Sequence, residues 1–306
     1  MTSPAQNDGM TLVAFVVNRT LLRDPRGFLR RCEAAARERG WEPWFVPDTG
    51  AGGGQAPARR AVAGGAGLVF AAGGDGTVRA CAEALAGTGV PLAIVPLGTA
   101  NLTARALGVP GRAERALEAG FGGRDRRIDL GRIEEAGAGG TWFTAMAGIG
   151  LDAAVVQAAG AHLKRRFGWM AYALAGTTRL ALPPRDFTVQ LDDAEPVRRR
   201  ARCVVVANSG LLPGGFSLLP AARLDDGLLD VGVLAPDGTW GWVRVAGRVL
   251  ARRQGRDREL ERFPARHVRI SAVVALPRQV DGEIAAPARA LEVSVRPGAL
   301  IVRQPR

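Results

Sequence analysis

Residues 67–77 read GLVFAAGGDGT, an apolar run that passes directly into a loop with three glycines in five residues. The run Gly67–Ala72 is typical of a strand buried on both faces, and a helical pattern follows over Val78–Ala86. Glycines let the backbone turn tightly and approach a ligand, and the start of a helix offers free N–H groups to a phosphate. The loop Gly73-Gly74-Asp75-Gly76-Thr77 therefore predicts a phosphate-binding turn, in which Asp75 orders the loop or helps to position a metal-bound phosphate.

A second glycine turn follows the next predicted strand, Pro91–Val95. It reads PLGTAN over residues 96–101 and contains Gly98, Thr99 and Asn101. Because ligands of doubly wound sheets bind outside the carboxyl ends of neighbouring strands, we expect the two turns to form one crevice. Thr99 and Asn101 supply hydrogen-bonding groups for the ribose, base or phosphates of a nucleotide. The chain contains no Gly-x-x-x-x-Gly-Lys-Ser/Thr motif, which excludes a P-loop protein.

Around these turns, the first third of the chain alternates strand-like and helix-like segments. The expected strands are Thr11–Val17, Glu42–Val46, Gly67–Ala72 and Pro91–Val95. The expected helices are Pro25–Gly40, a small-residue helix after the glycines of 50–54, Val78–Ala86 and Ala100–Leu107. Strands that alternate with helices imply right-handed crossovers and a parallel sheet. Residues 1–127 are therefore predicted to form an α/β nucleotide-binding domain.

After about residue 125 the pattern changes to short strand-like runs separated by turn residues. These runs are Ile128–Ile133, Thr141–Ala147, Phe187–Leu191, Cys203–Ala207, Leu229–Leu234, His267–Val273 and Leu291–Val295. Two helices are expected among them, at about Asp152–Leu180 and Thr239–Arg253. This pattern predicts a β-rich antiparallel sandwich domain over residues 128–306, and the extreme C-terminus is a candidate to return to the first domain.

The composition is that of a globular protein with a strong positive charge. Hydrophobic residues make up 47% of the 306 residues and charged residues 23%, and the formal net charge is +12. Almost all of the positive charge is arginine, with Lys164 the single lysine, and a GC-rich genome would produce that bias without any function. A positive field attracts ATP, anionic lipid or nucleic acid, but no repeated basic-aromatic pattern supports nucleic acid. We therefore expect no nucleic-acid partner.

The remaining features predict a cytoplasmic protein that contacts the inner face of the membrane only peripherally. Cys32, Cys81 and Cys203 are far apart and odd in number, which suits a reducing compartment and gives no metal-ligand spacing. The first ten residues lack the basic-then-apolar pattern of a secretory signal, and no apolar run is long enough to span a bilayer. The run Lys164-Arg165-Arg166, close to Trp169, is the candidate membrane contact.

The motifs, taken in order, resemble one family. Gly73–Thr77 followed by Pro96–Asn101 resembles the catalytic domain of diacylglycerol kinases, sphingosine kinases and their bacterial lipid-kinase relatives. GGDGT alone is also similar to NAD kinases and phosphofructokinases, so the later motifs decide between them. Those motifs are Asp129 in RIDLG, GIGLDA over 148–153, PAARLDDGLLDV over 220–231 and VDGE over 280–283. The resemblance covers residues 11–296 and implies a fold of the NAD-kinase and diacylglycerol-kinase type.

The resemblance implies an ATP-dependent lipid kinase and assigns its ligands. In such kinases ATP lies on the loop Gly73–Thr77 and on the threonine of the second turn, here Thr99, and Thr49 is a further candidate for nucleotide contact. A structural Mg²⁺ is implied at Asp226, with the backbone carbonyls of Arg223 and Leu228. The acceptor is a lipid hydroxyl at the membrane surface. Diacylglycerol, monoacylglycerol, phosphatidylglycerol and sphingoid bases all present one.

The resemblance also implies a general base within VDGE, at either Asp281 or Glu283, with Asp129 and Asp152 as supporting residues. A carboxylate beside the acceptor hydroxyl is the group that a kinase needs to accept its proton. Each Asp-Gly pair taken alone is more typical of a β-turn than of a catalytic or metal site. Only the order of these pairs alongside GGDGT favours the catalytic interpretation.

Two departures from the family pattern keep other functions open. Many relatives begin the first strand-to-helix loop with Asn-Pro, whereas here Asn18 precedes Arg19 and Thr20. Many bacterial relatives also have Asp directly after the second turn, whereas this chain has Leu102. A catalytically weak protein that binds nucleotide or lipid is one alternative. An NAD-kinase-like enzyme is the other, although the chain lacks the Asn-Glu and Thr-Gly-Ser-Thr-Ala-Tyr-like segments of that class.

Overall fold

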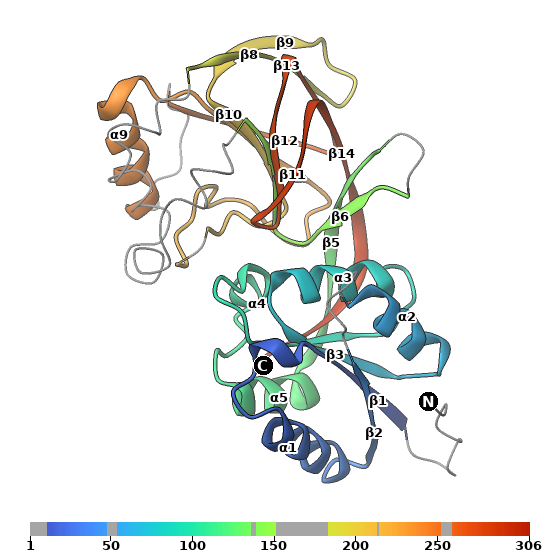
Figure 1. The fold of residues 1–306 in the computed structure, drawn as a ribbon. Coiled ribbons are helices and arrows are strands. Elements are labelled where there is room, and N and C mark those ends of the chain that lie inside the picture. Colours follow the sequence, from blue (N-terminus) through green and yellow to red (C-terminus); the bar gives the residue numbers. More distant parts are fainter. Residues whose placement is uncertain (1–10, 48–53, 136–138, 151–182, 213, 252–258) are drawn as a thin grey trace. The chain divides into compact units, whose positions relative to one another are not determined.

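The computed structural model describes residues 11–47, 54–135, 139–150, 183–212, 214–251 and 259–306 (Figure 1). The chain forms two compact units, the first made of Met1–Ile128 with Gly298–Arg306 and the second of Asp129–Pro297. It leaves the first unit within β5 (Arg124–Ile133) and returns to it within β14 (Glu283–Gln304). Each unit has its own hydrophobic core.

The first unit is built on a parallel sheet, as the alternating pattern predicts. Its strands are β1 (Thr11–Val17), β2 (Trp41–Pro47), β3 (Leu68–Gly73), β4 (Leu92–Pro96) and the last part of β14. They lie in the order β2-β1-β3-β4-β14, and every pair is parallel. β1, β3 and β4 are almost entirely buried, in agreement with their unbroken apolar sequences.

Helices cover both faces of this sheet. They are η1 (Arg19–Leu21), α1 (Pro25–Arg37), α2 (Gln55–Ala63), α3 (Asp75–Leu85), α4 (Leu102–Ala106) and α5 (Ala113–Gly122). α1 and α5 pack together on one face and α2 and α3 on the other (Figure 1). The sequence analysis did not predict α5. It approaches the sheet closely because Gly120 lies against the ring of Phe70, where a Cβ atom would come within 2.3 Å.

The second unit is an antiparallel β-sandwich, as predicted. Its further elements are β6 (Thr141–Phe143), β7 (Met146–Ile149), β8 (Arg185–Leu191), β9 (Val197–Ala201), β10 (Cys203–Ala207), β11 (Leu229–Leu234), α9 (Gly238–Leu250), β12 (Leu260–Ala265) and β13 (His267–Val280). One run of strands is β12-β11-β10-β7-β13-β14, and β8 pairs with the first part of β13 and with β9.

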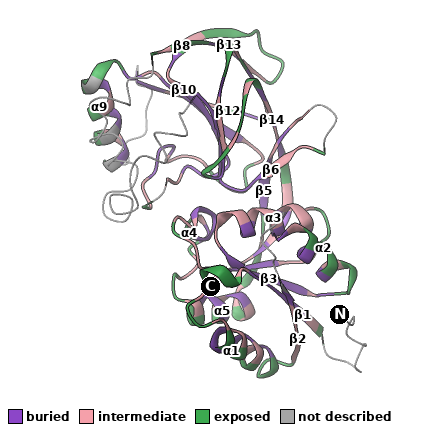
Figure 2. Ribbon diagram, viewed as in Figure 1, coloured by how far each residue is buried: buried purple, intermediate pink, exposed green. Residues whose placement is uncertain are grey.

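β13 connects the two layers of the sandwich because it pairs with different strands along its length. Its first part pairs with β8 and its last part with β7. The core between the layers holds Phe187 of β8, Val204 and Val206 of β10 and Val231 of β11. On the other face of β10, Cys203 and Val205 pack in the cluster that includes Trp242 and Val249 of α9. The buried strands and the more exposed outer surfaces of the helices are visible in Figure 2.

Several local predictions for the second unit need correction or extension. The single strand expected at Thr141–Ala147 is two strands, β6 and β7, separated by a turn at Thr144 and Ala145. The strands β9 and β12 were not predicted, and β13 and β14 are much longer than expected. β9 reads VRRRA, and its three consecutive arginines interrupt the alternation of apolar and polar residues that predicts a strand. The helix expected at 152–180 lies outside the described residues.

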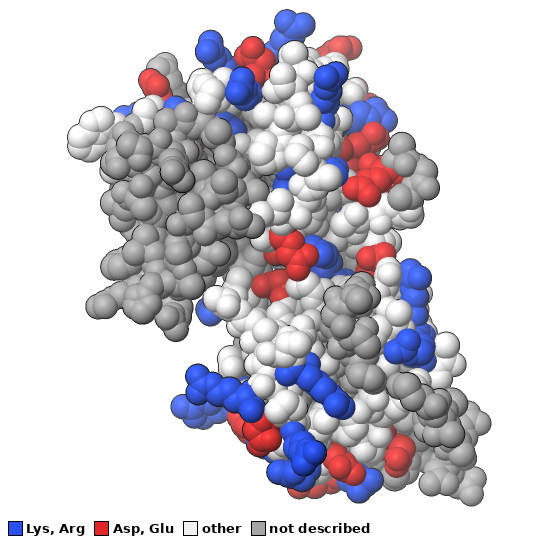
Figure 3. Space-filling view, viewed as in Figure 1, with Lys and Arg blue, Asp and Glu red and all other residues white. Residues whose placement is uncertain are grey.

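On the face drawn in Figure 3, arginine side chains are spread over each unit with Asp and Glu among them. No described helix combines the length and the apolar character that crossing a bilayer requires.

Candidate functional site

The two predicted glycine turns lie side by side at the carboxyl ends of β3 and β4. β3 and β4 are neighbours in register, and the N–H of Leu97 donates to the carbonyl of Gly73 at 2.9 Å. Gly74 directly precedes α3. A Cβ atom added to Gly98 would lie 2.6 Å from the Cα atom of Gly74. The reverse substitution is less crowded, because a Cβ atom on Gly74 would lie 3.5 Å from the Cα atom of Gly98. The close approach of the two loops therefore depends on Gly98 most strongly.

Asp75 joins the two loops through a hydrogen bond. Its Oδ1 atom accepts from the backbone N–H of Leu102, the first residue of α4, at 2.6 Å. A carboxylate is well suited to this position because it satisfies an N–H group that the helix itself leaves unpaired. The side chain of Leu102 is buried. Leu102, which departs from the family pattern, thus binds Asp75 through its backbone N–H and packs its side chain into the core.

Asn101 determines the shape of the second loop. Its φ angle is 48°, in the left-handed region, and its side chain binds both backbone groups of Gly98. Oδ1 accepts from the N–H of Gly98 at 3.0 Å, and Nδ2 donates to its carbonyl at 2.8 Å. Thr99, between these residues, is exposed. The amide of Asn101 therefore orders the loop, and Thr99 is exposed within it.

The first strand-to-helix loop reaches the same edge of the sheet. The N–H of Asn18 donates to the carbonyl of Ala72 at the end of β3. The Oδ1 atom of Asn18 accepts from the N–H and the hydroxyl of Thr20, at 3.1 and 2.6 Å. This loop, which also departs from the family pattern, is closed by its own hydrogen bonds, and Arg19 within it is exposed.

In the second unit, Asp281 lies in the turn between β13 and β14 and is 4% exposed. Its carboxylate accepts four hydrogen bonds from the turn between β6 and β7. Oδ2 accepts from the N–H and hydroxyl of Thr144 at 2.9 and 3.1 Å, and Oδ1 accepts from the N–H groups of Ala145 and Met146 at 2.8 and 3.0 Å. Glu283, two residues along the chain, is exposed at the start of β14.

Asp129 holds the turn at Asp225-Asp226-Gly227. It is 2% exposed, its N–H donates to the carbonyl of Leu224 at 2.6 Å, and its Oδ2 accepts from the N–H of Gly227 at 2.7 Å. Gly227 has a φ angle of +72°, which favours glycine at this position. The predicted supporting residue and the predicted metal turn are thus in direct contact.

The groups that the resemblance names at this turn are all of the oxygen type that a hard cation such as Mg²⁺ prefers. Asp226 is exposed, and its Oδ1 accepts from the N–H of Leu228 at 3.1 Å, which folds the turn around the carboxylate. A carboxylate oxygen and the carbonyls of Arg223 and Leu228 are all oxygen donors, the type that Mg²⁺ prefers. Burial raises the pKa of the neighbouring Asp230; Arg262 lowers that pKa and the charge of Asp226 raises it further. Over the described residues, no three Asp, Glu, His or Cys side chains gather as a metal cluster.

Asn208, which the sequence did not single out, contacts the predicted supporting residue Asp129. It directly follows β10 and is fully buried. Its Nδ2 atom donates to the carbonyls of Asp129 and Thr144, at 2.7 and 3.1 Å. The turns of the first unit were identified by glycines that directly follow a buried strand, and here the buried strand Cys203–Ala207 is followed by a polar pair and a single glycine. Within the segment Asn208-Ser209-Gly210 it resembles an ordinary turn and was overlooked.

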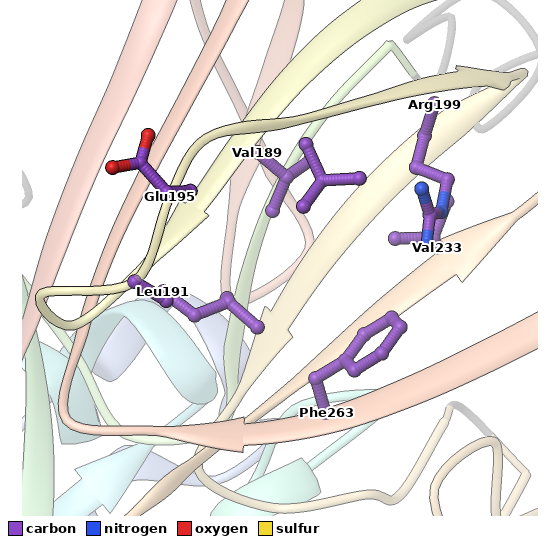
Figure 4. A pocket seen from close by; sticks show the side chains of 8 residues that line it. Val189, Leu191, Glu195, Arg199, Val233 and Phe263 are labelled. Atoms are coloured by element: carbon purple, nitrogen blue, oxygen red, sulfur yellow. The ribbon is translucent and has the colours of Figure 1, made fainter.

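A small apolar pocket of about 70 Å³ lies elsewhere in the second unit, between the β8–β9 hairpin and β11 and β12. Val189, Leu191 and Phe263 turn toward it, as Figure 4 shows. None of the residues that line this pocket belongs to the turns that contain Asp226 and Asp281.

Several of the predicted site residues belong to segments that the structure does not describe. They are Thr49, Asp152, the last three residues of GIGLDA, and the candidate membrane contact formed by Lys164, Arg165, Arg166 and Trp169. All of them lie outside the described residues and remain sequence predictions.

Two family models match the chain in succession. Residues 13–133 match the diacylglycerol kinase catalytic domain, and residues 145–304 match the YegS C-terminal NAD kinase beta sandwich-like domain. A probable lipid kinase YegS-like from Pseudomonas fluorescens is 34% identical over 280 residues, which is 90% of each chain. A diacylglycerol kinase from Mycobacterium tuberculosis is 32% identical over 248 residues, which is 80% of this chain and 79% of that protein.

Solved structures share the fold at lower identity. A putative diacylglycerol kinase from Bacillus anthracis superposes with a TM-score of 0.81 at 20% identity, covering 98% of both chains. An NAD kinase from Archaeoglobus fulgidus superposes with a TM-score of 0.53 at 12% identity, covering 97% of this chain and 94% of that one. The fold is therefore the one that diacylglycerol kinases and NAD kinases have in common.

Proposed function

Because the chain belongs to the family of lipid kinases that contains the diacylglycerol kinases and the YegS-like proteins, we propose that it transfers the γ-phosphate of ATP to the hydroxyl group of a diacylglycerol-like lipid. The observation that carries this proposal is the pair of glycine turns joined at the carboxyl ends of β3 and β4. A relative at 32% identity is named a diacylglycerol kinase, which supports this acceptor. The net charge of +12 suits peripheral contact with an anionic membrane surface.

The nucleotide site of the proposal is the start of α3 with the loop before α4. The backbone N–H groups of Asp75, Gly76 and Thr77 lie in the first turn of an eleven-residue helix, where N–H groups and the helix dipole favour phosphate oxygens. Gly74 leaves the space that a phosphate needs beside them. Thr99, exposed on the neighbouring loop, supplies a hydroxyl donor from the second side. In kinases this positioning of phosphates accounts for most of the catalysis.

For the general base we propose Glu283. Of the two candidates, Asp281 already accepts four hydrogen bonds, which occupy the lone pairs with which it would take a proton. Glu283 is exposed and lies two residues away, at the start of β14. In this assignment Asp281 fixes the turn. Glu283 accepts the proton of the lipid hydroxyl as the hydroxyl oxygen bonds to the γ-phosphorus of ATP, and the bond from that phosphorus to the departing ADP breaks.

For the metal we propose that Asp226, with the carbonyls of Arg223 and Leu228, would hold Mg²⁺. The bound cation would neutralise the carboxylates of this turn and fix its shape. Two observations support this proposal. All three groups offer oxygen atoms to a cation, and Asp129 accepts a hydrogen bond from the N–H of Gly227 in the same turn. The phosphoryl-transfer step itself is assigned to the residues of the two glycine turns and to Glu283.

The test compares two substitutions of exposed glutamates in the same unit. Glu283→Gln removes the proposed base, and Glu195→Gln removes an exposed carboxylate from the hairpin between β8 and β9. Phosphorylation of dispersed diacylglycerol is measured by mass spectrometry of the lipid phosphate. Glu283→Gln is expected to lower kcat by about 10²- to 10⁴-fold with little change in the KM for ATP. The assignment of the base is wrong if both variants keep the parental kcat.

A further inference from the structure

The side chain of Asn208 lies at the centre of a buried network in the second unit. Its amide donates to the carbonyl of Asp129 at 2.7 Å and to the carbonyl of Thr144 at 3.1 Å. Its backbone N–H also donates to the carbonyl of Ala145 at 2.8 Å. Because both side-chain contacts are carbonyl oxygens, the atom facing them must be Nδ2 and not Oδ1. One residue thus binds two segments that are separated in the sequence.

Each of these segments supports a different functional turn. The backbone of Thr144–Met146 donates to the carboxylate of Asp281, which precedes Glu283 by two residues. The side chain of Asp129 accepts from Gly227 in the turn that contains Asp226. A displacement of Asn208 would therefore be transmitted to both turns, through Thr144 on one side and Asp129 on the other.

The oxygen of the same amide has no hydrogen-bond partner among the described residues, although the side chain is fully buried. An unpaired buried acceptor destabilises the folded state. Global stability alone therefore does not account for an asparagine at this position. The two hydrogen bonds that Nδ2 donates do account for the asparagine, because no smaller side chain offers two N–H donors on one atom at this reach.

We propose that Asn208 is a positioning residue, which holds the base-bearing turn and the Asp226 turn in a single arrangement. This role rests on the proposed function, since it matters for catalysis only if Glu283 is the base. Asn208 contacts neither substrate nor metal in this proposal. It acts through the carbonyls of Thr144 and Asp129.

The experiment compares Asn208→Ala, Asn208→Asp and a matched core variant, Val233→Ala. Val233 is buried in the core of the sandwich and takes no part in the network, so it controls for loss of stability alone. All proteins are assayed well below the lowest melting temperature. Asn208→Ala is expected to lower kcat by about 10- to 100-fold while the KM for ATP stays near the parental value, because the turn that bears Glu283 is displaced. Val233→Ala is expected to lower the melting temperature and keep kcat.

The aspartate variant gives a pH signature that general destabilisation would not produce. An ionised carboxylate would repel the two carbonyls, whereas a protonated one can donate to one of them. The activity of Asn208→Asp, relative to the parent at the same pH, is therefore expected to rise as the pH falls. A ratio that stays constant with pH would contradict the role of the donated bonds.

Amide hydrogen exchange separates this proposal from the proposed function. Asn208→Ala is expected to speed exchange at Thr144–Met146 and at Gly227, and Val233→Ala is expected to leave those amides protected. Unchanged exchange at both turns, or an equal loss of kcat in Asn208→Ala and Val233→Ala, would overturn the positioning role. A parent protein without lipid kinase activity would instead overturn the proposed function, and the exchange data would still decide whether Asn208 holds the two turns.

Discussion

The close contact of Gly98 with Gly74 makes Gly98→Ala the sharpest probe of the nucleotide site. The added Cβ atom would lie 2.6 Å from the Cα atom of Gly74 and 2.9 Å from Oδ1 of Asn101. Carbon atoms in contact are normally about 3.5 Å apart, so the two loops must separate by about 0.9 Å. A misplacement of about 1 Å at a reacting group costs on the order of 10²-fold in rate. We therefore expect kcat/KM for ATP to fall by about that factor.

The same substitution has a modest cost in stability, which keeps the result interpretable. Overpacking by one methyl group typically costs about 1–3 kcal/mol, which is below the about 5–15 kcal/mol that stabilises a typical domain. The control is Gly111→Ala, because a Cβ atom at Gly111 meets nothing within 4 Å. Steady-state kinetics with varied ATP, together with calorimetric titration of an ATP analogue, measure both the rate and the affinity.

The expected result is a large loss of ATP affinity and rate in Gly98→Ala, with both unchanged in Gly111→Ala. If folded Gly98→Ala protein keeps the parental kcat and KM for ATP, the two loops do not act as a joint phosphate site. The assignment of the nucleotide to the ends of β3 and β4 would then be refuted.

Three further outcomes are expected. Asp281→Ala leaves buried N–H groups unpaired at a cost of about 3 kcal/mol, so the Tm should fall by roughly 6–12 °C in calorimetry; an unchanged Tm would show that this carboxylate does not hold the turn. Excess Mg²⁺ should raise the Tm of the parent and not that of Asp226→Ala, whereas equal shifts would mean that this turn binds no cation. Burial raises the pKa of the Cys32 and Cys203 thiols to about 12, and in Cys32 this effect outweighs the lowering effect of Arg31. Neither thiol should therefore react with iodoacetamide in native protein at pH 8. Rapid labelling of either cysteine, measured by peptide mass spectrometry, would contradict their burial.

Much of the fold could be predicted because its buried strands carry their own signal. Cys203–Ala207 and Leu229–Leu234 have the bounds that their apolar sequences predict, and Thr11–Val17 does too. Their side chains are buried on both faces, so the apolar run ends where the strand ends. β9 gives no such signal, since its arginines lie on a strand that, among the described strands, pairs with β8 alone.

The break between β6 and β7 could not be predicted from local sequence. TWFTAMAG looks like one continuous strand, but the N–H groups of Thr144, Ala145 and Met146 donate to the carboxylate of Asp281. That carboxylate is more than 130 residues away in the sequence, so only the folded chain brings the two together. The choice between Asp281 and Glu283 as base was open for the same reason, because the burial of Asp281 and its four hydrogen bonds arise only in the folded chain.

The central claim is that the protein phosphorylates a lipid with ATP, and one competition assay tests it most directly. The protein is incubated with Mg²⁺, ATP labelled at the γ-phosphate, a mixed lipid dispersion containing diacylglycerol, and NAD in the same tube. Labelled lipids and nucleotides are then separated and identified by mass. We predict that the label enters the lipid fraction as a phosphomonoester and that folded Asp75→Ala protein transfers none. Label in NADP, or ATP binding without transfer to any lipid, would contradict the account.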